Sequence, residues 1–219
     1  PKCLDNYKSF LNFYLSDLEK SILERFPGIE KIAISSDWKD GVLSLKIKQR
    51  EIACLLCLEK ELVPIIEGEN SLLEPEETNF LSKSEECYYL DKNGIIFEQA
   101  PKTQGSFLNK ILITEPKKRP LGSEVIAPEK LEKLNQAFVL SAKEESPISL
   151  NHLEMETENS QEVKLVTNEG FDIFYNLNDD FNEILKIISG MKEKQLKDSF
   201  RNLEYIDYRY PPKMYYKIR

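Results

Sequence analysis

The sequence has very little histidine, the side chain that general acid–base catalysis uses most often. It contains a single histidine, His152, among 219 residues, so a Ser-His or Cys-His nucleophile pair would have to be built on that residue. The segment NHLEME around His152 has no G-x-S-x-G or related motif nearby. There is no glycine-rich phosphate loop either. The sequence therefore predicts a protein that is not an enzyme, with no cofactor and no small-molecule substrate.

Long apolar runs and basic patches are also missing. No stretch approaches the ~18 consecutive apolar residues that a membrane-spanning helix needs, and no signal peptide is visible. The chain begins at Pro1 without an initiator methionine, so we expect that something upstream is missing. The net charge of −8 and the pI near 5.0 disfavour a nucleic-acid partner. The 41% of apolar and 31% of charged residues are typical of a folded protein.

The four cysteines are Cys3, Cys54, Cys57 and Cys87. Cys54-Leu-Leu-Cys57 has the spacing of a metal or redox motif, but it lies in a strand-like run, and a zinc site would need two more ligands from Cys3, Cys87 or His152. We therefore predict buried apolar thiols and no metal site. Cys54 and Cys57 would lie ~10 Å apart on opposite faces of one strand, too far to bridge each other. The sequence leaves the oxidation state of the cysteines open.

Hydrophobic spacing predicts a small α+β unit at the start of the chain. Apolar residues recur at helical intervals over 13–26, and Pro27-Gly28 ends that helix. Two strands are expected at 29–36 and 41–50, with a turn between them that ends in Asp-Gly. Fifty residues bury little surface, so this unit needs a neighbour or more chain to be stable.

The rest of the chain has the pattern of a mainly antiparallel sheet with two helices, so the fold class is α+β. The expected elements are hairpins at 88–98 and 162–176, strands at 52–59, 110–116 and 148–156, a short strand at 62–68 broken by Pro64, a surface loop at 69–86, and helices from Pro128 to about Ala142 and over 178–196. Asn178 or Asp179 is the expected cap of the second helix, and Gly190 is a candidate early end.

The last hairpin, LEYIDYRYPPKMYYKIR at 203–219, is unusually rich in tyrosine. Pro211-Pro212 ends its first strand because proline cannot donate to a ladder. Alternation predicts a core face with Ile206, Tyr208, Met214, Tyr216 and Ile218, and an outer face with Tyr205, Asp207, Arg209, Tyr215 and Lys217. A chain that ends on a strand often leaves it at a sheet edge. That edge is either a docking template for another chain or a plain edge that Lys213, Lys217 and Arg219 protect from aggregation.

Four stretches together resemble the FtsQ/DivIB family of bacterial cell-division proteins. They are ERFPGIEKIAISSDWKDGVLSLKIKQREIA (24–53), YYLDKNGIIFE (88–98), LGSEVI with the helix after it, and NLEYIDYRYPPKMYYK (202–217). The first resembles the end of the family's POTRA domain, and the last resembles its closing motif. The chain departs from the pattern at Gln49-Arg50, where the family has Glu-Arg, at Glu51-Ile52-Ala53, which lacks the family's proline, and at Tyr208, where leucine is commoner.

The resemblance implies a POTRA domain over 1–53 that lacks its first strand and helix, and an FtsQ/DivIB-like β domain over 54–219. It implies a non-enzymatic scaffold of the divisome at the septum, anchored in the cell membrane by a single helix upstream, with this region extracytoplasmic. The partners would be FtsB/DivIC-like and FtsL-like division proteins, bound by strand addition at the C-terminal sheet edge. The matching positions are Tyr205, Asp207 and Arg209, followed by Tyr215, Tyr216 and Lys217 on the last strand.

Two other functions stay open at this point. The first is a POTRA-type accessory module of an outer-membrane assembly or secretion system that binds extended segments, which predicts further POTRA repeats upstream. The second is an enzyme of unrecognised type, which would need a pocket with perturbed carboxylates near His152 or near Cys54 and Cys57.

Overall fold

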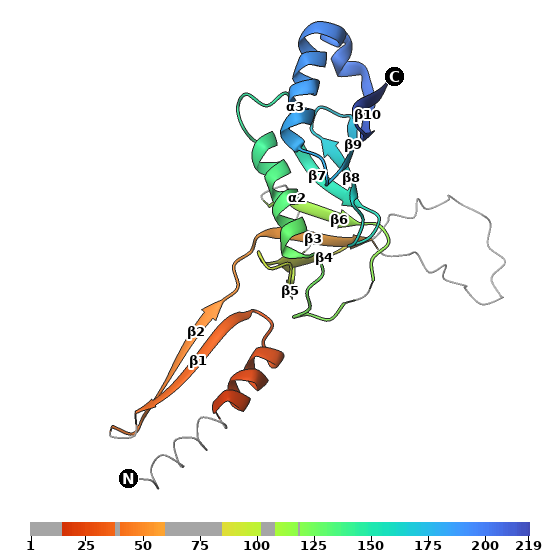
Figure 1. Ribbon diagram of the computed structural model, residues 1–219. Coiled ribbons are helices and arrows are strands. Elements are labelled where there is room, and N and C mark those ends of the chain that lie inside the picture. Colours follow the sequence, from red (N-terminus) through yellow and green to blue (C-terminus); the bar gives the residue numbers. More distant parts are fainter. Residues whose placement is uncertain (1–14, 38–39, 60–84, 102–107, 118) are drawn as a thin grey trace, which may run out of the picture.

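The computed structural model describes residues 15–37, 40–59, 85–101, 108–117 and 119–219. Within these ranges the chain forms a two-stranded sheet and a nine-stranded sheet together with helices (Figure 1). The fold is α+β, as the sequence predicts. None of the helices in these ranges is both long and apolar enough to cross a membrane.

The first unit is a helix followed by a hairpin. The helix covers 15–25, and the chain turns at Pro27-Gly28, as predicted. Strands β1 (Ile29–Asp37) and β2 (Val42–Gln49) pair antiparallel, with Ile32 opposite Ile47. Ile32 is buried, whereas every residue of β2 is exposed. The apolar face of this hairpin is therefore only partly covered by the described residues.

The nine-stranded sheet has the order β11-β10-β9-β8-β7-β6-β3-β4-β5. Its strands are β3 (Cys54–Glu59), β4 (Glu85–Leu90), β5 (Ile96–Gln99), β6 (Lys110–Ile113), β7 (Leu150–Met155), β8 (Glu162–Thr167), β9 (Asp172–Asn176), β10 (Leu203–Tyr210) and β11 (Lys213–Ile218). Five of its eight neighbouring pairs are antiparallel, which agrees with the prediction of a mainly antiparallel sheet. The predicted strand at 62–68 lies outside the described residues, as does the predicted loop at 69–86 up to the start of β4.

Two helices cover one face of this sheet, α2 (Pro128–Ser141) and α3 (Phe181–Gly190) (Figure 1). Their apolar faces pack on fully buried strand residues, and the shared core includes Leu134, Ile184, Ile188, Leu153, Leu165, Ile173 and Ile206. Pro128 begins α2. Proline is tolerated there because the N–H groups of the first helical turn have no acceptor within the helix.

The start of α3 differs by one residue from the prediction. Asp180 caps it, and its carboxylate accepts the Asn182 N–H at 2.9 Å, whereas Asn178 and Asp179 precede the cap. The three adjacent polar residues all have side chains that suit an N-cap, so the sequence alone does not choose between them. The α-helix ends at Gly190, the candidate early end within the predicted range 178–196. It continues as a π-helical turn, η1 (Met191–Leu196), and a 3-10 segment, η2 (Lys197–Asn202).

Arg50 joins the first unit to the large sheet. Its backbone N–H donates to the Gly28 carbonyl at 2.8 Å, and its Nε donates to the Pro27 carbonyl at 2.9 Å. Its Nη1 lies 2.6 Å from Oδ2 of Asp91, in the β4–β5 turn. The other oxygen of Asp91 accepts the N–H groups of Asn93 and Ile95. One nearly buried ion pair thus connects the end of the helix, the end of β2 and a turn of the sheet.

Two glycines with positive φ provide a test of this packing. A Cβ at Gly94 (φ +72) would lie 1.7 Å from the Ile126 carbonyl oxygen, whereas a Cβ at Gly170 (φ +91) would meet nothing within 4 Å. We expect Gly170→Ala to cost only the ~1–2 kcal/mol of a left-handed alanine. Gly94→Ala adds a backbone clash, so we expect it to cost more than ~3 kcal/mol. Urea unfolding of both variants measures the difference, and equal losses would contradict this packing.

Candidate partner-binding edge and groove

Strand β11 forms one edge of the nine-stranded sheet and pairs only with β10 within the described residues. The register of this pair shifts at two β-bulges, and each bulge has its extra residue on β10. Strand β11 itself is therefore regular. The N–H of Arg219 donates to the Asn202 carbonyl, on the β10 side. Because backbone groups alternate along a strand, Tyr215 and Lys217 also point their N–H and C=O groups at β10. Those of Tyr216 and Ile218 point at the open edge.

The register confirms which residues share a face. Tyr216 lies opposite Ile206, and Tyr215 lies opposite Asp207. Met214, Tyr216 and Ile218 therefore lie on the helix-covered side of the sheet with Ile206 and Tyr208, as alternation predicts. Tyr205, Asp207, Arg209, Tyr215 and Lys217 lie on the other side.

The prediction that Tyr216 and Ile218 are core residues is wrong. Their side chains are 46% and 40% exposed, although Ile206 and Tyr208 on the neighbouring strand are buried. The reason is that β11 has no outer neighbour among the described strands and that a groove separates it from the helix. Met214, nearer the turn, is half-buried and packs against the core.

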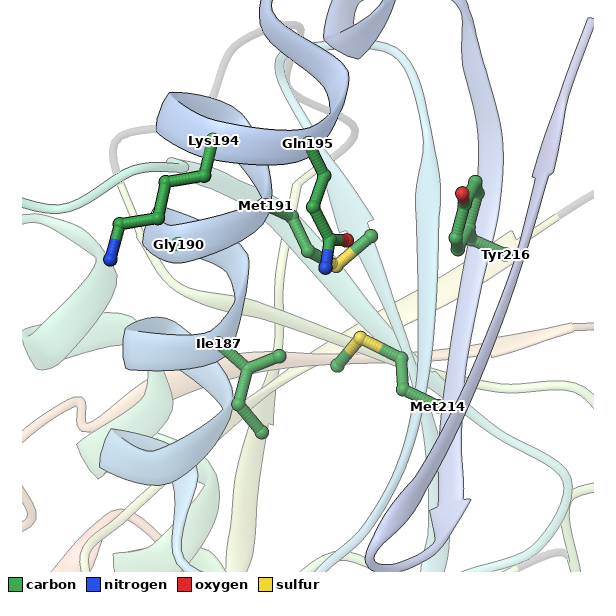
Figure 2. Close-up of a pocket in the computed structure, with 7 residues that line it drawn as sticks. All are labelled: Ile187, Gly190, Met191, Lys194, Gln195, Met214 and Tyr216. Carbon is green, nitrogen blue, oxygen red and sulfur yellow. The ribbon is translucent and has the colours of Figure 1, made fainter.

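The groove between β11 and the helical segment has a volume of about 360 Å³ (Figure 2). Met214 and Tyr216 form one wall, and the other wall comes from Ile187, Gly190, Met191, Lys194 and Gln195. In Figure 2 the side chains of Met191 and Met214 extend toward each other from opposite walls, whereas Lys194 points away from β11. The result is a mostly apolar hollow directly beside an open strand edge.

Sequence reasoning missed the helical wall of this groove. The signals were present, since Met191 belongs to the apolar face of the helix and Gly190 leaves space where a side chain would fill it. What the sequence could not supply is the distance between this helix and β11.

Asp207 and Arg209 bind each other on the open face. Arg209 Nε lies 2.9 Å from Oδ1 of Asp207, and its Nη2 lies 2.7 Å from Oδ2. Nη1 reaches Glu162 on β8 at 2.9 Å, and the guanidinium stacks over Phe174 with its carbon 5.3 Å from the ring centre. Hydrogen bonds from Arg209 hold the pKa of Asp207 below its usual range. The pair therefore braces β10 against β8 and β9.

The remaining predicted site residues differ in their exposure and in the contacts that their side chains make. Tyr205 is half-buried and packs edge-on against Phe174, with ring centres 6.0 Å apart. Lys217 pairs with Glu204 at 2.8 Å. Tyr215 is 55% exposed. The six predicted residues thus lie on one hairpin but on two faces, with Tyr216 alone on the groove side.

His152 belongs to a network of ion pairs on the open face. Its Nε2 lies 2.9 Å from Glu154, and Lys164 bridges Glu154 and Asp172 at 3.1 Å each. Hydrogen bonds from His152 and Lys164 lower the pKa of Glu154 to about 2. A hollow of about 450 Å³ borders this network and also reaches Phe174 and Arg209. The carboxylates Glu154 and Asp172 are therefore occupied by cationic partners on the sheet itself.

Two of the cysteines are not the apolar thiols that the sequence predicts, and the oxidation state that the sequence leaves open is resolved for them. Cys57 and Cys87 face each other across β3 and β4 and form a disulfide, with Cα atoms 4.0 Å apart. Cys54 is a buried free thiol on the opposite face of β3, as predicted, and burial raises its pKa to about 12. Cys3 lies outside the described residues. The sequence could not reveal the bridge because the register of β3 against β4 is set across 30 residues.

Comparison with known proteins identifies no relative: no family model matches the chain, and no curated protein matches it.

The Asp207–Arg209 brace predicts a pH dependence of stability. Asp207 has a folded pKa below its ordinary value of 3.8, so its contribution is present above that value and is lost as the pH falls through the folded pKa. We expect wild type to lose more unfolding free energy than Asp207→Asn between neutral pH and the acid range. Urea unfolding at stepped pH measures this. Asp198→Asn, at an exposed position, serves as the control. Parallel curves for wild type and Asp207→Asn would exclude the brace.

Proposed function

We propose that this protein is a non-enzymatic scaffold of bacterial cell division, of the FtsQ/DivIB type, which docks an FtsB/DivIC-type partner that travels with FtsL. The observation that carries the proposal is the outer edge of β11, which no described strand pairs with and where the backbone groups of Tyr216 and Ile218 are directed outward beside an apolar groove. An open edge of this kind is a template for another chain's backbone.

The mode of binding follows from the geometry of the edge. A partner strand that pairs with β11 gains main-chain hydrogen bonds to Tyr216 and Ile218. The side chains that it presents on the helix side meet the groove between Met214 and Met191. On the other side they meet Tyr215 and Lys217. The side chain of Tyr216 is 46% exposed beside the groove, so a partner strand on β11 can bury aromatic surface there.

Asp207 and Arg209 have a supporting part in this proposal. Their side chains are tied to each other and to Glu162, so they hold β10 in place and present β11 rather than contact the partner directly. The groove residues Met214 and Met191 take their place beside Tyr216 in the contact surface.

The disulfide supports an extracytoplasmic location. Disulfides such as Cys57–Cys87 form and persist in oxidising compartments and are rare in the cytosol. A domain outside the cytoplasmic membrane, held there by a single anchoring helix upstream, fits both this chemistry and the resemblance of the sequence to FtsQ/DivIB.

Amide hydrogen exchange tests strand addition at single-residue resolution. The probe is the extracytoplasmic part of an FtsB/DivIC-like protein encoded in the same genome. We expect its binding to slow exchange at Tyr216 and Ile218, whose N–H groups face the open edge. Tyr215 and Lys217, already bonded to β10, should change little. Protection confined to β2, whose residues are all exposed, would instead favour the accessory module that binds extended segments.

Alanine substitution at the groove tests the side-chain contribution. We expect Tyr216→Ala to weaken binding by ~2 kcal/mol, about 30-fold, because it removes a central aromatic contact. Tyr210→Ala is the matched control, since Tyr210 is 62% exposed in the same hairpin but lies at the turn, outside the groove. Calorimetric titration gives both affinities, and thermal unfolding verifies that both variants fold. Equal affinities for Tyr216→Ala and wild type would remove the groove from the binding site.

A further inference from the structure

Three potential metal ligands meet on the open face of the sheet, far along it from β11. Sγ of Cys57, Sγ of Cys87 and a carboxylate oxygen of Glu85 all lie within 4.8 Å of one another. Cys57 faces Cys87 directly across the β3–β4 ladder, and Glu85 is next but one to Cys87 on the same face of β4. The cluster is therefore fixed by the strands rather than by a loop.

Lys110 orients the carboxylate of this cluster. Its Nζ lies 2.6 Å from Oε2 of Glu85. Lys110 stands on β6 and Glu85 on β4, the two neighbours of β3, so the ion pair spans β3 on the face that carries the disulfide. A carboxylate has two oxygens, so Glu85 can bind Lys110 and still offer an oxygen to a metal. An ammonium group held beside the cluster also favours the thiolate form of a reduced cysteine.

The donor set selects the kind of metal. Two thiolates and one carboxylate suit a borderline-soft divalent ion such as Zn²⁺, which accepts a tetrahedron of sulfur and oxygen ligands. Water can complete the fourth position because Glu85 and Cys87 are only partly buried, which also gives the ion a route of entry. Cys54 cannot compete for the ion. It lies on the other face of β3, and its raised pKa, about 12, keeps it a thiol.

We propose that the reduced form of the Cys57–Cys87 pair is a zinc site, completed by Glu85. A Cys-x-x-Cys dithiol reductant supplies two electrons and two protons to the disulfide and becomes a disulfide itself. Zn²⁺ then displaces the two thiol protons. The strands β3 and β4 are clipped together in both states, by a covalent bond when oxidised and by the metal when reduced.

This site is independent of the proposed partner-binding edge, and its test uses metal alone. The chain carries Cys3→Ser so that only the described cysteines remain. It is reduced with a phosphine without oxygen and titrated with Co²⁺, which reports thiolate ligands by a sulfur-to-metal charge-transfer band. We expect one Co²⁺ per chain, a tetrahedral visible spectrum, displacement by Zn²⁺, and no band from the oxidised chain.

Single substitutions test whether Co²⁺ binds at this cluster rather than at another thiol. Cys57→Ser and Cys87→Ser should each lose the charge-transfer band of the two-thiolate site. Cys54→Ala should retain it. Glu85→Gln should weaken Co²⁺ binding at least about tenfold, by loss of an anionic ligand. A band that survives in Cys57→Ser, or one that disappears in Cys54→Ala, overturns the proposal. So does a folded, reduced chain with no band.

Unfolding on reduction would also give a decisive result. Should the reduced chain lose its circular-dichroism signal without metal, we expect Zn²⁺ to restore it, because binding to the folded site is coupled to folding. Failure of Zn²⁺ to restore the signal, or equal restoration in Cys87→Ser, overturns the proposal.

Discussion

The burial of one face of the nine-stranded sheet under α2 and α3 determines how the rest of the structure is arranged. Strands β6 to β10 turn their apolar side chains to these helices and bury them completely at Ile111, Leu153 and Ile206. The helical cover stops short of β11, which continues the same apolar face at Tyr216. The exposed surface at this edge is thus the part of the core face for which the described residues supply no cover.

Local pattern was enough to predict most elements and both faces of the last hairpin. Alternation placed Tyr216 with Ile206 and Tyr215 with Asp207, because the period of a strand is a property of the backbone alone. Whether a helix covers a given strand residue does not follow from this local pattern. Whether Tyr216 is buried depends on where α3 ends relative to β11, and that is set by packing over the whole sheet. The sequence therefore identified the right strand and assigned Tyr216 to the wrong environment.

The sequence also did not predict which distant segments contact each other. Cys57 meets Cys87, and Arg50 meets Asp91, only because β4 returns beside β3 in one particular register. The stretch 24–53 contains Arg50, and the predicted hairpin at 88–98 contains Asp91. Neither motif contains the information that the two form an ion pair. The same holds for Asp207 and Arg209, whose mutual contact follows from their spacing but whose link to Glu162 does not.

The last strand can be a docking template for another protein and also an edge that is protected from self-association, because the same basic side chains serve both roles. Residues 208–219 contain basic side chains and no acidic ones, in a chain with a net charge of −8. Antiparallel pairing of β11 with a second copy of itself would bring Lys213, Lys217 and Arg219 of the two copies together, and like charges on paired strands repel. A strand of another protein carries no such penalty. The same lysines that oppose self-association can therefore leave the backbone of Tyr216 and Ile218 available to a different chain.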